Sequence, residues 1–265
     1  MVNVDGLKIP DVRIVTDSAG PFEVIEYVHD SSVAPSNAMT EYFMAEMEVR
    51  RRQLLATLSD GDDGVILQAG AMQMMFGNVD VATNVNSVGG FLKGAMRGKV
   101  TGESAIKPLY RGSGQVLLEP TYKYIILEDL SDWSGGIIVE DGMFLASTGG
   151  VEQKAIARKS VSSALAGNEG LFNLGLFGNG VVALESNVHP DELLFVEMKN
   201  DVVRIDGSYA IAWSPSLDFT VERTTSTLIG SAASGEGLVN VYRGTGNIVI
   251  APVTPSSSLF AATHS

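Results

Sequence analysis

Hydrophobic residues occur along the chain in short runs that are separated by turn-forming residues. Most runs have the length of a strand, roughly four to eight residues, are rich in Val, Ile and Leu, and are bounded by Gly, Asp, Asn or Pro. One segment differs, because over about 37–48 apolar residues keep helical spacing at Met39, Phe43 and Met47. We therefore predict an all-β protein with one short helix, followed by a strand before Asp60.

The runs repeat along the chain with a fixed period. Three ten-residue segments align without gaps at intervals of 66 residues: RGSGQVLLEP at 111–120, FGNGVVALES at 177–186 and RGTGNIVIAP at 243–252. Each contains Gly-x-Gly followed by a run rich in Val, Leu or Ile. A matching acidic motif lies upstream of each segment, at Glu103, Glu169 and Glu236.

A third marker completes the unit. Three longer stretches share an apolar run, a polar or Gly-rich turn, a second apolar run and a closing glycine, at Gly70, Gly142 and Gly207. Because all three markers recur in one order, we predict that the chain consists of three repeats of about 66 residues, each built from β-strands. The triplicated domain spans 49–252, with units at about 49–120, 121–186 and 187–252. Residues 1–48 form an N-terminal extension that carries the helix, and 253–265 form a loose tail.

The Gly-x-Gly motifs have two interpretations, a turn or a phosphate cradle. A cradle needs a helix directly after the glycines, so that backbone amides and the helix dipole face the anion. Strand-like runs follow instead, so we interpret the motifs as hairpin loops that need a positive φ. A structural role in turns is thus predicted for Gly70, Gly112, Gly114, Gly142, Gly178, Gly180, Gly207, Gly244 and Gly246.

The composition excludes several classes of function. The 265 residues carry a net charge of −13, which opposes binding to nucleic acid and to anionic membranes. Cys is absent, which removes disulfides, thiolate nucleophiles and Cys-ligated zinc. No apolar run approaches the ~18 residues of a membrane-spanning helix. Because the start also lacks the features of a signal or transit peptide, we expect a cytoplasmic location.

Candidate catalytic chemistry is sparse. The three histidines, His29, His189 and His264, have no ligand spacing, and no catalytic set forms around them. His29 and His264 lie in ends that look poorly structured, and His189 is expected in a surface turn. The sequence therefore predicts no catalytic residue, no cofactor and no enzymatic activity.

One candidate metal site follows from the repeat. If the units close around an axis, Glu103, Glu169 and Glu236 converge, and converging carboxylates repel unless a cation such as Ca²⁺ bridges them. The favoured interpretation is local: each glutamate accepts hydrogen bonds from the backbone of its own Gly-rich loop.

Two basic segments are candidate contact sites. Arg50, Arg51 and Arg52 would contact an anion or a partner, although a solvated strand or helix face is the favoured interpretation. The Gly-rich segment 89–99 combines Phe, Leu and Met with Lys and Arg. It would make a peripheral membrane or partner contact, whereas a loop packed over a barrel end is the simpler interpretation.

Several motifs, in order, resemble those of a known family. Over about 50–252 the chain resembles the altered-inheritance-of-mitochondria protein twenty-four family, through AGAMQMMFGNV at 69–79, GGFLKGAMRGKVTGES at 89–104, DGMFLAS at 141–147, NEGLFNLGLFGNGVVALES at 168–186 and GEGLVNVYRGTGNIVIAP at 235–252. The resemblance implies a β-rich fold similar to the tryptophan RNA-binding attenuation protein, in which the three repeats form a pseudo-threefold β-barrel or sandwich. It supplies no catalytic residues. Eukaryotic relatives are mitochondrial and linked to inner-membrane architecture, whereas this chain, without a transit peptide, resembles a bacterial member.

The expected function is a non-enzymatic scaffold or protein-interaction module that self-associates into a homo-oligomer and binds a protein partner. RNA binding, which the name of the fold suggests, is not expected at this charge, since fold does not imply function. One alternative is a small-molecule-binding β-barrel or an enzyme that uses carboxylates at a barrel end. Another is a peripheral membrane organiser that acts through 89–99.

Overall fold

The protein is built almost entirely from antiparallel β-strands, in a computed structural model that describes residues 4–82, 107–157, 172–206, 209–223 and 238–253. The predicted all-β class is confirmed, and α1 (Ala38–Glu46) is the one α-helix of the described residues. Short 3-10 turns are η1 (Pro35–Asn37), η3 (Leu130–Trp133) and η4 (Pro190–Glu192). The strands are β1 (Arg13–Ala19), β2 (Phe22–Tyr27), β3 (Arg52–Leu58), β4 (Val65–Leu67), β5 (Met72–Ala82), β6 (Leu109–Leu118), β7 (Tyr124–Asp129), β8 (Gly136–Val139), β9 (Phe144–Thr148), β10 (Glu152–Ala157), β11 (Phe172–Phe177), β12 (Val181–Ser186), β13 (Leu194–Asp206), β14 (Ala210–Trp213), β15 (Asp218–Arg223) and β16 (Leu238–Ile250).

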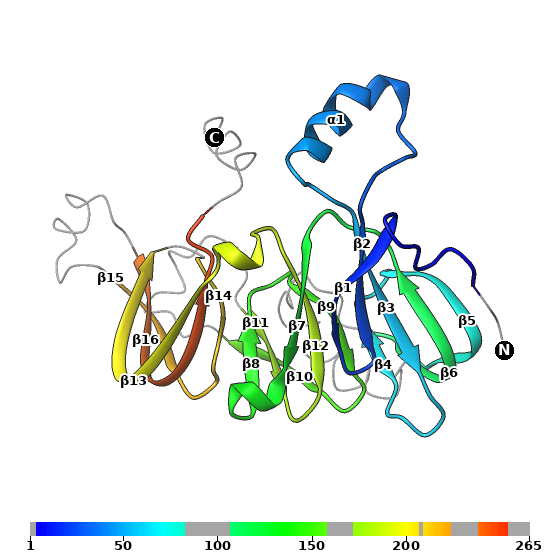
Figure 1. Cartoon of the computed structure of the whole chain (residues 1–265). Coiled ribbons are helices and arrows are strands. Elements are labelled where there is room, and N and C mark those ends of the chain that lie inside the picture. The colour runs from blue at the N-terminus through cyan, green and yellow to red at the C-terminus, as the bar shows by residue number, and fades with distance from the viewer. Residues whose placement is uncertain (1–3, 83–106, 158–171, 207–208, 224–237, 254–265) are drawn as a thin grey trace, which may run out of the picture.

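The strands form two sheets that lie side by side (Figure 1). The first has the order β1-β2-β3-β6-β4-β9-β12-β7, with β5 beside β6, and it curves into a nearly closed barrel because β7 returns to contact β1. The second has the order β10-β11-β8-β14-β16-β13, with β15 beside β16. The middle of the chain contributes to both sheets, since β7, β9 and β12 belong to the first and β8, β10 and β11 to the second.

Each predicted unit has the same internal pairing. In each unit the last strand in sequence pairs on one side with the first strand or strands and on the other side with the middle ones. In the first unit, β6 has β3 and β4 on one side and β5 on the other. The pair β11–β12 lies likewise between β7–β8 and β9–β10, and β16 lies between β13 and β14–β15. Neighbouring units meet through two short antiparallel contacts, β4 with β9 and β8 with β14.

Equivalent hydrogen bonds recur at the spacing of the sequence repeat. Three backbone amides 66 residues apart each donate to a backbone carbonyl oxygen at 2.7 Å: Glu119 to Ala71, Glu185 to Met143 and Ala251 to Tyr209. These regularities support the predicted repeat. The pseudo-threefold symmetry of the whole chain stays a prediction.

The hairpin role predicted for the Gly-x-Gly motifs is wrong. In every unit the motif lies where the last strand passes from one neighbour to the next, and β6, for example, passes there from β4 to β3. The glycines therefore bend a strand between two sets of partners rather than reverse the chain. The motifs lie within β6 for Gly112 and Gly114, within β16 for Gly244 and Gly246, and between β11 and β12 for Gly178 and Gly180.

Close backbone approach explains why these bends need glycine. Gly112 and Gly244 have φ of +115° and +120°, which residues with a Cβ rarely adopt. A Cβ on Gly114 would fall far inside contact distance of the Phe76 carbonyl oxygen on the neighbouring strand β5.

The other three predicted turn glycines fall in two groups. Gly70 and Gly142 lie in tight turns before β5 and β9, with φ of +81° and +82°. Gly207 lies outside the described residues.

The segment predicted as an N-terminal extension contributes two strands to the first sheet. β1 and β2 form a hairpin, and β2 pairs with β3. Phe22 and Val24 on one face of β2 are buried in the same core cluster as Leu54 and Ala56 of β3. The helix predicted over 37–48 is α1, which leaves the sheet after β2 and returns to it at β3.

An ion pair between β15 and β16 makes part of the stability depend on pH. Arg243 donates to both carboxylate oxygens of Glu222, at 2.7 and 2.9 Å, and the Thr220 hydroxyl donates at 2.7 Å. These hydrogen bonds, that of Arg243 above all, lower the pKa of Glu222 from 4.5 to about 2. Because the folded pKa lies below the unfolded one, the stabilisation is present above the unfolded pKa and is lost as the pH falls through the window between the two values.

Replacing Glu222 with Gln should therefore flatten the acid limb of the stability profile, since the amide does not titrate. Thermal unfolding between roughly pH 6 and pH 2.5 measures this. Glu197→Gln is the control, because the carboxylate of Glu197 is 68% exposed and pairs with Lys199 alone at 3.0 Å among the described ion pairs. A Glu222→Gln profile as steep as that of the wild type would contradict the assignment.

Candidate interaction site at helix α1

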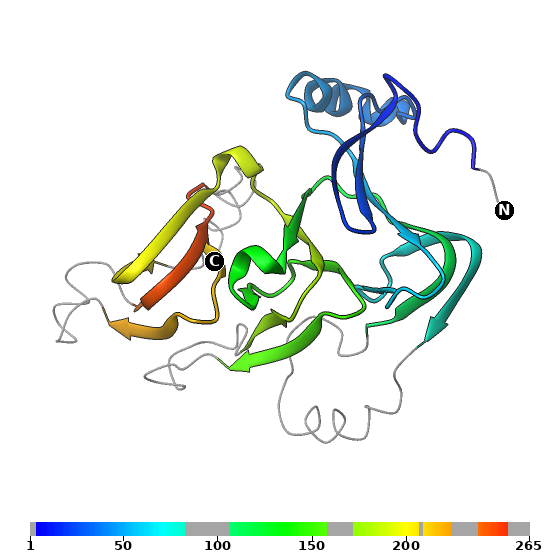
Figure 2. The ribbon, with the colours of Figure 1, turned by 60° about the horizontal axis from the view of Figure 1, so that its bottom comes forward.

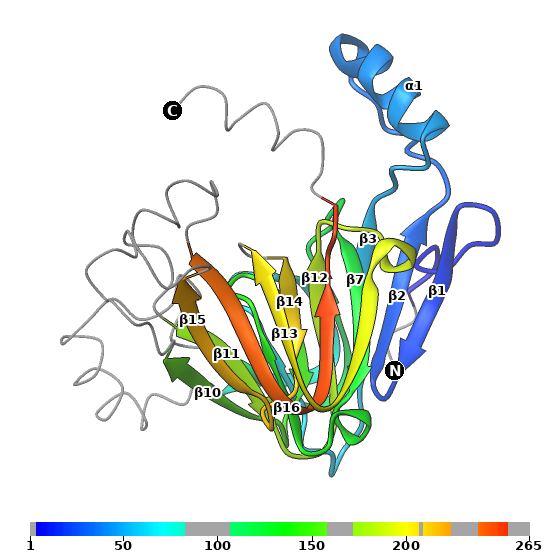
Figure 3. The ribbon, with the colours of Figure 1, turned by 90° about the vertical axis from the view of Figure 1, so that its left-hand side faces the viewer.

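The helix α1 lies clear of the sheets (Figure 1, Figure 3). Two connecting segments, 28–34 after β2 and 47–51 before β3, join it to the first sheet, and we call these two segments the stalk. None of its residues is buried. The large apolar side chains of the helix and its C-cap are exposed at 75% for Met39, 60% for Tyr42, 57% for Phe43 and 77% for Met47. Since Met39, Phe43 and Met47 are spaced by four residues, they lie along one side of the helix.

The charge of this helix has one sign. Glu41 and Glu46 lie within α1, Glu48 follows it, and no Lys or Arg occurs between residues 38 and 47. Four large exposed apolar side chains on one short helix present more hydrophobic surface than an isolated surface residue does, and such patches mark interaction sites.

A buried arginine fixes the base of the stalk. Arg52 opens β3 and is only 7% exposed, its Nη2 lies 2.8 Å from Glu26 Oε2 on β2, and its guanidinium carbon lies 4.2 Å from the ring centroid of Tyr124 on β7. The prediction of a solvated basic face is therefore wrong for this residue. The ion pair and the ring supply the charge and the apolar surface that a buried guanidinium needs.

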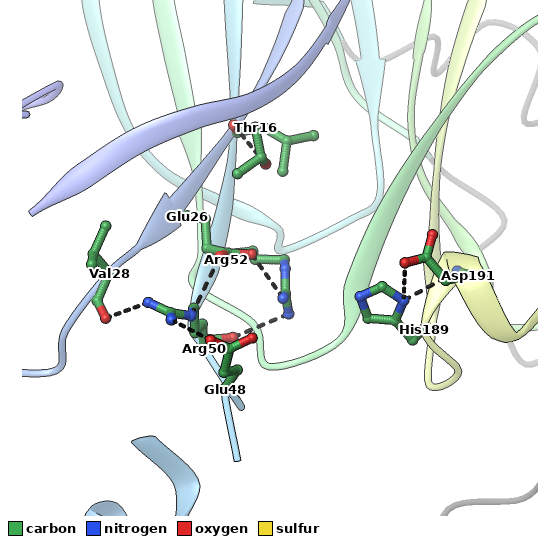
Figure 4. Close-up of polar contacts among 9 residues, drawn as sticks. Thr16, Glu26, Val28, Glu48, Arg50, Arg52, His189 and Asp191 are labelled. Atoms are coloured by element: carbon green, nitrogen blue, oxygen red, sulfur yellow. Dashed lines mark hydrogen bonds and ion pairs between the residues drawn. The ribbon is translucent and has the colours of Figure 1, made fainter. Parts of the chain in front are cut away.

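The two preceding arginines extend the same network. The Nε of Arg50 lies 3.6 Å from Glu26, its Nη1 donates to the Val28 carbonyl oxygen, and its Nη2 lies 3.4 Å from Glu48 (Figure 4). Arg50 and Arg52 thus converge on the single carboxylate of Glu26. Both chains of the stalk are held together by charged hydrogen bonds.

Arg51 ties the stalk to the loop before β7. Its Nε lies 3.1 Å from Asp30 and donates to the Tyr122 hydroxyl at 3.2 Å, and that hydroxyl donates to Asp30 at 3.1 Å. The Tyr122 hydroxyl is a donor at neutral pH, as an ordinary tyrosine is, and burial raises its pKa further.

A cavity of about 320 Å³ lies between α1 and the end of β2. Its lining includes His29, Asp30, Tyr42, Ala45 and Arg50, so it mixes apolar and charged groups. His29 lies outside the regular elements, after the end of β2, and lines this cavity.

The second predicted histidine position fits a surface turn. His189 precedes η4 and accepts a hydrogen bond from the Asp191 amide at 3.1 Å (Figure 4). Its ring also packs edge-on against Tyr124, with the ring centroids 4.7 Å apart. His264 lies outside the described residues, as do Glu103, Glu169, Glu236 and the segment 89–99.

Neither a metal cluster nor a membrane span occurs in the described part of the chain. No three His, Asp or Glu side chains there gather as metal ligands. No helix there has the length and hydropathy needed to cross a membrane.

Sequence patterns indicated the helix but not its exposure. The apolar spacing of Met39, Phe43 and Met47 is equally typical of a helix packed on a core. The signal that distinguishes the two lies after the helix, where the basic run 50–52 meets Glu26 of β2 and Asp30, which follows that strand. Such pairing across 21 to 26 residues cannot be read from a linear pattern.

Comparison with known proteins places the chain in a family. Residues 46–253 match the family model described as mitochondrial biogenesis AIM24. An uncharacterised protein of Streptococcus pyogenes serotype M6 is 31% identical over 194 residues, which cover 70% of this chain and 75% of that protein. A crystal structure of a Streptococcus pyogenes protein is similar with a TM-score of 0.57 and 27% identity, covering 82% of this chain and 94% of the other. The chain belongs to the mitochondrial biogenesis AIM24 family.

Proposed function

We propose that this protein is a non-enzymatic scaffold that works as a homo-oligomer in the cytoplasm and binds a partner protein through α1. The observation that carries the proposal is the exposed apolar side of α1. Leaving four large apolar side chains in water is unfavourable at roughly 25 cal/mol per Å². The arginine network at the base of α1 nevertheless stabilises this arrangement, which suits a helix presented for binding.

The chemistry of α1 defines the kind of partner. A helix whose apolar residues are spaced by four residues binds in a hydrophobic groove of another protein. Because both charged residues of α1, Glu41 and Glu46, are acidic, the groove should have a basic rim. The negative charge of α1 also opposes its insertion into an anionic membrane.

Affinity purification from the host organism, after mild cross-linking, tests the proposal. Wild-type protein should retain one stoichiometric partner, and Met39→Ser/Phe43→Ser should lose it while keeping the wild-type melting temperature. Leu194→Ser/Phe195→Ser is the matched control, since these side chains are 52% and 68% exposed on β13, a strand of the second sheet, whereas α1 is connected to strands of the first. Retention of the same partner by all three proteins would contradict the role of α1, as would the absence of any partner.

A second candidate function rests on the cavity beneath α1. A volume of about 320 Å³ lies at the small end of the range for small-molecule sites. A ligand bound only by the folded state raises the melting temperature by mass action, so a thermal-shift screen of metabolites tests this alternative. A stabilising ligand whose effect disappears in Tyr42→Ala would favour a binding protein over a scaffold.

A further inference from the structure

One kind of strand pairing recurs between neighbouring units, once at each of the two junctions. β4 pairs with β9 with Leu67 opposite Ala146, and β8 pairs with β14 with Val139 opposite Ala212. Both pairings are antiparallel, and both turn two sets of strands into one continuous sheet.

The two contacts also share a hydrogen bond and a β-bulge. The Gln68 amide donates to the Leu145 carbonyl oxygen at 2.8 Å, and the Glu140 amide donates to the Ile211 carbonyl oxygen at 3.0 Å. Leu145 and Ile211 are each the extra residue of a bulge against the last strand of their unit. β5 has the same bulge at Gln73. The first unit therefore has the acceptor half of this contact as well.

Register identifies the residue of β5 that corresponds to the centre of the contact. Along the three last strands, residues 66 positions apart lie opposite equivalent partners: Leu117 opposite Met74, Ala183 opposite Ala146 and Val249 opposite Ala212. Met74 on β5 thus has the position that Ala146 and Ala212 have in the two contacts.

The same comparison identifies the donor half on β13. Val139 of β8 lies opposite Leu174, and Ile205 of β13 lies opposite Asn240, which is 66 positions later. Ile205 thus has the position of Val139, and its neighbour Arg204 has that of Ile138.

Both halves are open edges in this chain. Among the described residues β5 pairs with β6 alone and β13 pairs with β16 alone. β8, β9 and β14, which make the inner contacts, are almost fully buried, whereas β5 and β13 are exposed over most of their described length. Apolar side chains are exposed on both edges, including Met75 at 44% and Val202 at 38%. A long exposed edge strand is a template for pairing with another chain.

We infer that β13 of one copy pairs antiparallel with β5 of a second copy, and so makes between chains the contact that β4–β9 and β8–β14 make within one. Ile205 then lies opposite Met74, and Arg204 opposite Met75. The two surfaces differ, so the association is head to tail and continues until it closes into a ring. The inference rests on the homo-oligomer of the proposed function and assigns its interface.

The positions of β5 and β13 favour pairing between two molecules over pairing within one. β13 and β5 lie at opposite ends of the row of strands, in both the first view and the rotated one (Figure 1, Figure 2). Pairing of β13 with β5 within one molecule would require the two ends of the row of strands to come together.

Disulfide trapping tests the pairing, because the natural sequence contains no Cys. Residues opposite one another in antiparallel strands have Cα atoms roughly 4.5–5.5 Å apart, which a disulfide spans. Met75→Cys and Arg204→Cys are mixed, oxidised and run on a non-reducing gel.

We expect a covalent dimer that contains one chain of each variant. The double variant should give a ladder of multimers. Met75→Cys mixed with Lys199→Cys, which is exposed on β13 but out of register, should give at least tenfold less dimer.

Three results would overturn the inference. The first is a covalent dimer of Arg204→Cys alone, which would indicate that β13 pairs with β13 of another copy. The second is a cross-link within the monomer of the double variant. The third is the absence of any cross-link. Native mass spectrometry of the wild type separates this failure from that of the proposed function. A multimer without the cross-link overturns the β5–β13 pairing alone, whereas a monomer overturns both. Each variant should keep the wild-type melting temperature, so that loss of folding is recognised.

Discussion

Replacing Arg52 with Met lowers the free energy of unfolding by about 3 kcal/mol, because the substitution leaves Glu26 without its closest cation in a buried setting. The side chains of Arg52 and Glu26 are 9% and 17% exposed and approach to 2.8 Å. Arg50 keeps a contact of 3.6 Å with Glu26, which limits the loss. Methionine fills much of the volume over Tyr124, so the effect reports the charge and its hydrogen bonds more than the packing.

Urea unfolding measures the effect of Arg52→Met, and Arg51→Met is its control. Arg51 is 29% exposed and pairs with Asp30 at 3.1 Å, so its replacement should cost about 1 kcal/mol or less. Equal losses of unfolding free energy in the two variants would contradict the larger stabilising role that we assign to the Arg52–Glu26 pair.

Replacing Gly114 with Ala should cost about 3 kcal/mol or more, because the new methyl group overlaps the Phe76 carbonyl oxygen of β5. That oxygen belongs to the backbone of a paired strand and cannot move without breaking pairing. The prediction follows directly from the position of the motif inside β6, since a hairpin loop in solvent would accept alanine at lower cost.

Gly70→Ala is the matched control for this substitution. Gly70 has φ of +81°, but no atom lies within 4 Å of a Cβ built there, so only backbone strain of roughly 1–2 kcal/mol is expected. Denaturant unfolding of both variants gives the comparison. A Gly114→Ala protein as stable as Gly70→Ala would contradict the close approach of β5 and β6.

The β class and the helix could be predicted because they depend on local patterns. Short runs bounded by turn residues gave the strands, and the spacing of Met39, Phe43 and Met47 gave α1. The sequence pattern does not predict the hairpin of β1 and β2, because β1 is largely solvent-exposed and polar residues interrupt its apolar positions.

The role of the Gly-x-Gly motifs could not be predicted from the chain alone. A glycine pair between two apolar runs is common to a hairpin loop and to a bend within one strand, because both need positive φ or close backbone approach. Only the identity of the paired strands separates these structures, and pairing is a long-range property. The same limit applies to Arg52, whose partners Glu26 and Tyr124 are 26 and 72 positions away in sequence.

The two proposals combine into one account of function. Head-to-tail pairing of β13 with β5 would place one α1 on every copy, at a regular interval along the assembly. Several weak contacts presented together bind more tightly than any one of them, through a raised effective concentration. A scaffold that repeats a single apolar helix would bind a partner that is itself repeated or oligomeric.

A native mass spectrum of the protein, purified gently from its own host, tests the central claim most directly. The account predicts a discrete multimer of this chain without a small-molecule adduct, with a partner protein retained by wild type and lost in Met39→Ser/Phe43→Ser. A monomer that carries a stoichiometric small-molecule adduct would contradict the scaffold and identify a binding protein instead.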